Sequence, residues 1–209
     1  MISKVKYIAL ALFFITLLVF FINRFVVLAH VLSFSDAGSR CEDICTRFIY
    51  SMPVDKVENA ILEDLRLGKR KYLINQYIRI GSVFGIERLN RHFLNIYVKY
   101  ESIDGYDLMK YNLITAIGVI GILDNVNFLG ERIDGLSGDG LRDNKYEIAR
   151  SLFLLGSNNN KYLNSQNFTI TNELREVRNA VRESIGRERT FDEKMIIDQI
   201  YRPPKGWKS

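Results

Sequence analysis

Hydrophobic positions are most concentrated at the start of the chain. Residues 7–22, YIALALFFITLLVFFI, contain no charge, and a second apolar stretch, FVVLAHVLSF, occupies residues 25–34. As a helix rising about 1.5 Å per residue, residues 5–23 span roughly 28 Å, close to the thickness of the hydrocarbon core of a bilayer. The pattern therefore predicts a single transmembrane signal-anchor helix within residues 1–33. The basic residues expected at its two membrane interfaces are Lys4, Lys6 and Arg24.

The length of this run also bears on the cellular location of the protein. A cleaved signal peptide is the rival interpretation, but its apolar region is about 7–15 residues long, shorter than the run found here. Basic residues on the N-terminal side of the run favour a cytoplasmic N-terminus. We therefore expect an uncleaved, single-pass protein of the cell (inner) membrane, with the lipid bilayer as a partner. Residues 34–209 would form one periplasmic or extracellular domain.

The only two cysteines, Cys41 and Cys45, lie in a second hydrophobic pattern. Ser39 and Glu42 have the spacing of a capping box, which predicts a helix start. The apolar residues that follow at helical intervals, and that place both sulfurs on the core side, are Cys41, Ile44, Cys45, Phe48 and Ile49. Outside the cytoplasm a close cysteine pair is oxidised by default, so a local disulfide is expected. A regular helix separates these Cβ atoms by about 5–6 Å, more than a disulfide spans, so the first turn would have to distort. Two reduced core thiols, and a redox or metal site, are the alternatives.

The middle of the chain carries patterns that predict strands. Residues 71–80 and 92–103 place apolar, β-branched and aromatic residues at alternate positions, and Asp104–Gly105 follows as a turn signal. We expect a β-hairpin there and a further short strand at residues 167–171. The apolar residues 113–123 are too few to span a bilayer and belong in the core.

Two amphipathic helices are expected near the C-terminus. The first occupies residues 172–186, and the second opens with the capping box of Thr190 and Glu193. Helices and strands in this order predict an α+β domain. The first helix carries a stripe of arginines interleaved with glutamates, which is either a salt-bridged solvated face or a partner surface. These arginines are Arg175, Arg178 and Arg182.

Charge and residue inventory narrow the function. Residues 1–33 supply three of the five net positive charges and the remainder is nearly balanced, so no nucleic-acid partner is expected. His92 is the only histidine after residue 34, and no phosphate-binding loop or dinucleotide fingerprint occurs. We therefore assign no catalytic residue, metal ligand or cofactor, although carboxylates in the loop 131–145 would suit a hydrolase.

The sequence favours a non-catalytic interaction domain held outside the membrane by a single anchor. Components of secretion or envelope assemblies, and immunity-type proteins, have this organisation, and the expected partner is another envelope or exported protein. The alternative is a membrane-tethered thiol redox or copper-handling protein that uses Cys41 and Cys45. A thiolate at the start of a helix is stabilised by the helix dipole, which gives this alternative its physical basis.

Overall fold

The computed structural model describes residues 7, 8, 10, 12, 14, 24–34, 39–103, 105–133, 144–157 and 170–201. By its contacts the chain divides into two compact units, Met1–Ile49 and Tyr50–Ser209. Throughout the described residues, all regular elements are helices. These are α2 (Arg40–Tyr50), α3 (Val54–Leu67), η1 (Lys71–Leu73), α4 (Ile74–Val83), α5 (Glu87–Tyr100), α6 (Asp107–Ile120), α7 (Asn125–Ile133), α8 (Asn144–Leu154), α10 (Asn172–Glu183), α11 (Phe191–Asp198) and η2 (Gln199–Tyr201). The predicted α+β fold is therefore wrong.

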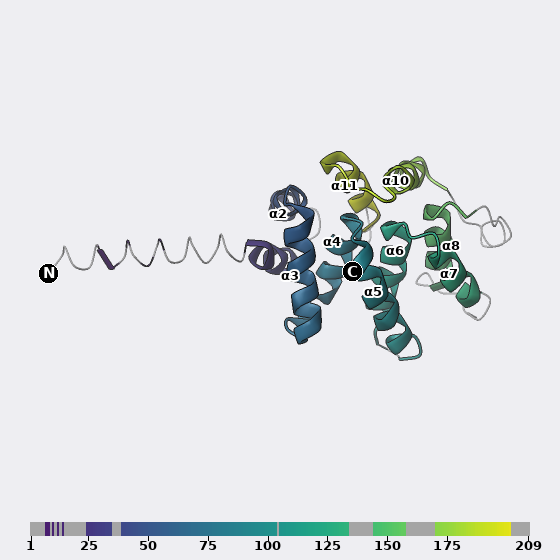
Figure 1. Ribbon diagram of the computed structural model, residues 1–209, viewed down its shortest axis with the longest axis horizontal. Helices are drawn as coiled ribbons and strands as arrows, with labels where there is room; N and C mark the ends of the chain where they lie inside the picture. The colour runs from purple at the N-terminus through teal and green to yellow at the C-terminus, as the bar shows by residue number, and fades with distance from the viewer. Residues whose placement is uncertain are drawn as a thin grey trace. The chain divides into compact units, whose positions relative to one another are not determined.

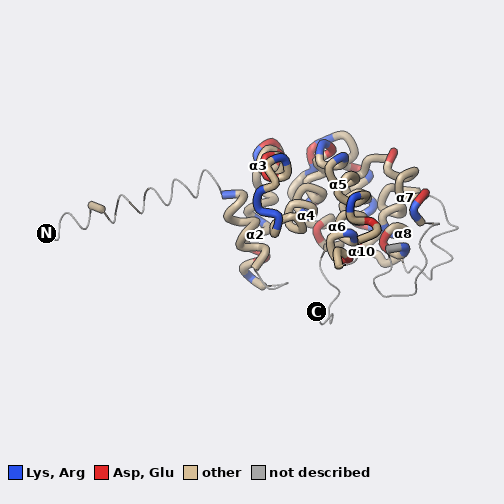
Figure 2. Tube along the Cα trace, turned by 90° about the horizontal axis from the view of Figure 1, so that it is seen from below, with Lys and Arg blue, Asp and Glu red and all other residues tan. Residues whose placement is uncertain are grey.

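The second unit is built from stacked helix pairs. Helices α4, α6 and α8 lie side by side in one row, and α3, α5 and α7 each pack against the helix that follows them (Figure 1). Figure 2, turned by 90°, shows α3, α5 and α7 in one layer and α4, α6 and α8 in the other. The chain reverses between α5 and α6 and between α6 and α7 through short connections, as antiparallel helix neighbours require. Helices α10 and α11 pack against α8 and α4 respectively.

The predicted strand at residues 71–80 is instead η1 followed by α4. Tyr72, the first residue of the expected alternation, is exposed, whereas Leu73, Tyr77 and Ile80, at intervals of four and three, are fully buried. A spacing of four places side chains on one face of a helix. Packing of α4 against α6 therefore selects the helical period of this segment.

The predicted strand at residues 92–103 lies mostly within α5, so the β-hairpin is also wrong. Leu89, Phe93 and Tyr97 follow one another at intervals of four, and all three are buried. Val98 belongs to the alternating apolar residues of the predicted strand, but its side chain is half exposed. The polypeptide turns between α5 and α6, but as a helix–helix connection.

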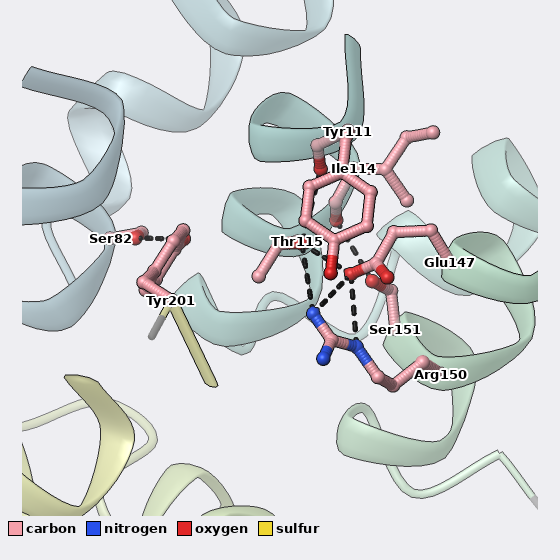
Figure 3. Close-up of polar contacts among 8 residues, drawn as sticks. All are labelled: Ser82, Tyr111, Ile114, Thr115, Glu147, Arg150, Ser151 and Tyr201. Atoms are coloured by element: carbon pink, nitrogen blue, oxygen red, sulfur yellow. Dashed lines mark hydrogen bonds and ion pairs between the residues drawn. The ribbon is translucent and has the colours of Figure 1, made fainter. Parts of the chain in front are cut away.

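Several other predictions are confirmed. Of the apolar residues 113–123, those from Leu113 to Ile120 are buried at every position in α6, at the centre of the row, whereas Leu123, beyond the end of the helix, is exposed. Gly118 lets α6 approach α8 closely, because a Cβ there would lie 2.8 Å from the Cα of Ser151. The Ser151 hydroxyl donates a hydrogen bond of 2.9 Å to the Ile114 carbonyl across the same contact (Figure 3).

In α11, Thr190 and Glu193 form the expected capping box. The strand expected at 167–171 falls largely outside the described residues.

One arginine holds the C-terminal ends of α4 and α6 together. Arg189 is 2% exposed, and its guanidinium donates hydrogen bonds to carbonyls at the end of both helices. Gly85 and Gly121 follow these helices with φ of 68° and 91°, a conformation that ends a helix and that L side chains rarely adopt. A Cβ at Gly85 would lie 2.8 Å from Arg189 Nε, so this guanidinium also needs the space that glycine leaves.

Polar contacts also attach α11 and η2 to α4. Arg79 donates to both carboxylate oxygens of Asp198 at 2.8 Å, and Tyr50 donates to the same carboxylate at 2.5 Å. The hydroxyls of Ser82 and Tyr201 lie 2.6 Å apart (Figure 3). Asp198 is completely buried, and these donors compensate for its loss of solvation.

The single-pass membrane anchor predicted for residues 1–33 is contradicted, and with it the inner-membrane location. No helix in the described part of the chain is both long and apolar enough to cross a bilayer. Residues 24–34 are described as helical, and at about 1.5 Å per residue they extend only about 16 Å. Most of residues 7–22 lies outside the described residues.

Candidate functional site

A hollow of about 550 Å³ lies beside α10 and contains the predicted arginine stripe. This volume falls within the range of ordinary ligand sites. The lining residues are Phe153, Ile170, Arg175, Arg178, Asn179 and Arg182. The structure thus brings all three arginines of the predicted partner surface to one concave site, together with an aromatic ring from α8.

Local sequence positions the arginines on one face of α10. Thr171 begins the helix by accepting a hydrogen bond of 3.3 Å from the Leu174 backbone N–H. The apolar face, which includes Val177 and Val181, is buried. The arginines are separated by three and four residues, a spacing that keeps them on a common face next to the buried one. The helix therefore presents them as a group because its other face is buried.

Packing restrains two of the three guanidinium groups. The Arg178 guanidinium lies over the Phe153 ring, 4.5 Å from its centroid, in a cation–π contact. Arg182 lies against Gly156, because a Cβ built there would come within 2.9 Å of its Cζ. Arg175 donates a hydrogen bond of 3.2 Å to Asn172 on the exposed side of the same helix.

The charge on this site is not balanced by neighbouring acids. Among the described residues none of these three arginines takes part in an ion pair, although glutamates occur on the same helix. Burial lowers the pKa of Arg178, and the positive charge of Arg182 lowers it further. Glu176 and Glu183 are seven residues apart and exposed on a different flank of α10. The described residues therefore do not form the salt-bridged face that was one interpretation of the sequence.

Cys41 and Cys45 are free thiols, so the predicted disulfide is wrong. They occupy adjacent turns of the regular helix α2, whose start is capped as expected by a 3.2 Å bond from the Glu42 N–H to Ser39 Oγ. A regular helix keeps Cβ atoms four residues apart too far from each other for a disulfide. Cys45 is buried as predicted, but Cys41 is exposed.

Of the two thiols, the buried Cys45 is the less reactive. Burial raises the pKa of the Cys45 thiol, and the neighbouring Cys41 raises it further. A raised pKa keeps the thiol protonated, whereas nucleophilic attack and metal binding need the thiolate. A search of the described residues finds no group of three or more His, Cys, Asp or Glu side chains arranged to hold a metal ion.

The other sequence candidates that the structure describes are not among the residues that line the hollow. Lys4 and Lys6, assigned to the membrane interface, lie outside the described residues, and Arg24 is an exposed residue of the first compact unit. His92 is exposed on α5. Residues 134–143 of the acidic loop considered for a hydrolase also lie outside the described residues.

A buried carboxylate that no sequence pattern indicated joins α6 to α8. Glu147 accepts hydrogen bonds from Arg150 Nε at 3.0 Å and Nη2 at 2.6 Å, and another from the Thr115 hydroxyl (Figure 3). Burial raises the pKa of nearby Tyr111 to about 12, and the Glu147 charge contributes to this rise. The carboxylate is thus held in an ion pair and does not line the arginine hollow. Its contacts are those of a structural link.

The sequence predicted the arginines of the hollow but not its other wall. Phe153 and Gly156 belong to the end of α8 and its C-terminal turn, and Ile170 precedes α10. Nothing in the sequence showed that the end of α8 meets α10. Contact between the two helices is a tertiary feature.

Comparisons with known proteins do not assign the chain to a family. No protein-family model matches it, and no curated protein or solved structure is significantly similar to it.

Proposed function

We propose that this protein is a helical interaction module, without catalytic activity of its own, that binds an acidic segment of a partner protein. The binding surface is the hollow formed by Arg175, Arg178 and Arg182 against the end of α8. Stacked helix pairs provide a stable framework, and the hollow provides the recognition element. This proposal keeps the interaction function inferred from the sequence and does not include a membrane anchor.

One observation carries the proposal: three arginines surround one hollow without an acidic partner among the described residues. Clustered like charges repel one another, and an acidic ligand would relieve that repulsion. Arginine clusters of this kind recognise carboxylates and phosphates in many complexes, because the planar guanidinium offers two parallel donors. Phe153 and Ile170 add apolar area beside the charges, as expected for an interface core.

The interaction can be measured with a defined acidic probe. The probe is a fluorescein-labelled peptide of alternating glutamate and glycine, and binding is followed by fluorescence anisotropy at low and at physiological salt. We expect Arg175, Arg178 and Arg182, replaced together by glutamine, to weaken binding at least about tenfold, because charge-assisted contacts are lost. Added salt should weaken wild-type binding, because the contacts lie near the surface.

Arg91→Gln is the matched control. Arg91 is an exposed arginine of α5 that does not line the hollow, so its substitution should leave binding unchanged. Melting temperatures of all variants establish that folding is retained. Equal binding by the triple variant and the wild type, or equal binding of a lysine–glycine peptide, would refute the proposed function.

A further inference from the structure

We infer that the ligand group of the arginine hollow is a single phosphomonoester on a partner polypeptide, a phosphorylated serine, threonine or tyrosine, rather than a carboxylate side chain. This inference rests on the proposed function and specifies the chemistry of the same site. Three features support it: the geometry of the guanidinium groups, the amount of charge around one hollow, and the position of the neighbouring glutamates.

The geometry of Arg178 and Arg182 suits a tetrahedral oxyanion. The two residues are four positions apart on α10, which places their Cβ atoms about 5–6 Å from each other on one face. Arg178 lies over the Phe153 ring and Arg182 lies beside Gly156, so the two guanidinium groups line the hollow from different positions. A planar carboxylate has two oxygens and is satisfied by one guanidinium group. A phosphate presents three acceptor oxygens that both guanidinium groups can share.

The charge around the hollow also favours phosphate. Arg175, Arg178 and Arg182 bring three positive charges to one cavity of about 550 Å³. A phosphomonoester supplies about 1.5–2 negative charges through one group at neutral pH. Carboxylates would need two or more side chains to supply the same negative charge. One phosphate group therefore neutralises more of the positive charge at the site than one carboxylate group does.

The neighbouring acids favour an isolated phosphate over an extended polyanion. Glu173, Glu176 and Glu183 are exposed on the same helix as the arginines. Basic and acidic residues are interspersed over the helices of the second unit, as Figure 2 shows. These glutamates lie on another flank of α10, so a single anion in the hollow avoids them. A nucleic-acid backbone or an anionic bilayer extends beyond the hollow and would bring further negative charges against them. A single phosphate on an otherwise neutral peptide avoids this repulsion.

The test measures the affinity of the protein for three peptides that differ only at their central residue. Each peptide has neutral glycine and alanine flanks, a fluorescein label, and phosphoserine, glutamate or serine at its centre. We expect the phosphoserine peptide to bind at least about tenfold more tightly than the glutamate peptide, and the serine peptide to bind most weakly. Equal affinity for phosphoserine and glutamate would overturn the phosphate inference and leave the proposed function standing.

A charge-preserving variant separates phosphate recognition from simple attraction. Replacing Arg178 and Arg182 together by lysine keeps both positive charges but removes the two planar guanidinium groups. This variant should lose about tenfold in affinity for the phosphoserine peptide and bind the glutamate–glycine peptide almost as the wild type does. An unchanged affinity for phosphoserine would refute the assignment, as would a wild-type protein that prefers phosphatidylserine vesicles or a single-stranded oligonucleotide. Failure to bind any acidic peptide would overturn the proposed function as well.

Discussion

Replacing Arg189 by methionine should be among the most destabilising single substitutions in the second unit. Burial lowers the pKa of this guanidinium to about 10, so it still carries its charge at neutral pH. It donates to the Ser82 carbonyl at 2.6 Å, to the Ile120 carbonyl at 3.1 Å and to the Ser184 hydroxyl at 2.9 Å. The Val119 carbonyl is a further acceptor. Methionine keeps much of the side-chain volume and removes every donor.

The magnitude follows from these contacts. A hydrogen bond to a charged group contributes about 1.5–3 kcal/mol, but the contributions do not add, and removing the charge recovers part of its desolvation penalty. We therefore expect Arg189→Met to lower the free energy of unfolding by about 3–5 kcal/mol, because several buried acceptors lose their donor at once and each unsatisfied acceptor costs about 1–3 kcal/mol. For a chain of this size that loss corresponds to a fall of roughly 6–20 °C in Tm. Arg189→Lys should lose about half as much, because a single ammonium cannot reach both helix ends.

The assay is urea unfolding followed by circular dichroism at a helical wavelength, with Arg91→Met as the control. The control changes an exposed arginine and should alter the free energy of unfolding by no more than about 0.5 kcal/mol. A loss below about 1 kcal/mol for Arg189→Met would refute the reasoning, because it would show that water or neighbouring groups satisfy the same carbonyls.

Three further predictions follow from the structure. Gly85→Ala should destabilise the protein by about 2–4 kcal/mol in urea unfolding, more than Gly68→Ala at about 1 kcal/mol. Both glycines have positive φ, but a Cβ would clash with a guanidinium only at Gly85, so equal losses would refute the argument. An arginine hydrogen bond and the helix cap lower the pKa of Glu193 to about 2. The stability that this carboxylate contributes is therefore present above its unfolded pKa and lost as pH falls from about 4.5 to about 2, so the wild type and Glu193→Gln should converge in Tm over that range. A constant difference would contradict this assignment. In the native protein, iodoacetamide should alkylate exposed Cys41 quickly and buried Cys45 only after urea is added, as read by peptide mass spectrometry. Simultaneous labelling of both thiols would contradict the described burial.

Local signals predicted the C-terminal part of the chain well. The capping box of Thr190 and Glu193 is a reciprocal contact within four consecutive residues, so the sequence contains all of its components. The buried stripe of α10 depends only on the helical period, and the same period placed Arg175, Arg178 and Arg182 on one face. These features need no information from distant segments.

The choice between helix and strand at residues 71–80 and 92–103 was decided by packing. Both segments contain apolar residues at intervals of two and of four, so local pattern alone is ambiguous. The burial of Tyr77 in α4 and Phe93 in α5 shows that the apolar residues at intervals of four, not two, face the core. The neighbours that bury them, α6 above all, are distant in sequence, and secondary structure follows from this tertiary environment.

By itself, the sequence determined the amphipathic faces, the cap of α11, the core position of most of residues 113–123 and the grouping of the three arginines. Only the tertiary structure decided that the fold is helical in its described part, that Arg189 joins the ends of α4 and α6, and that the end of α8 makes the arginine face a hollow. The physical reason is the range of the interactions. Periodicity and capping act over a few residues, whereas a hollow or a shared cap requires segments to meet that lie tens of residues apart in the chain.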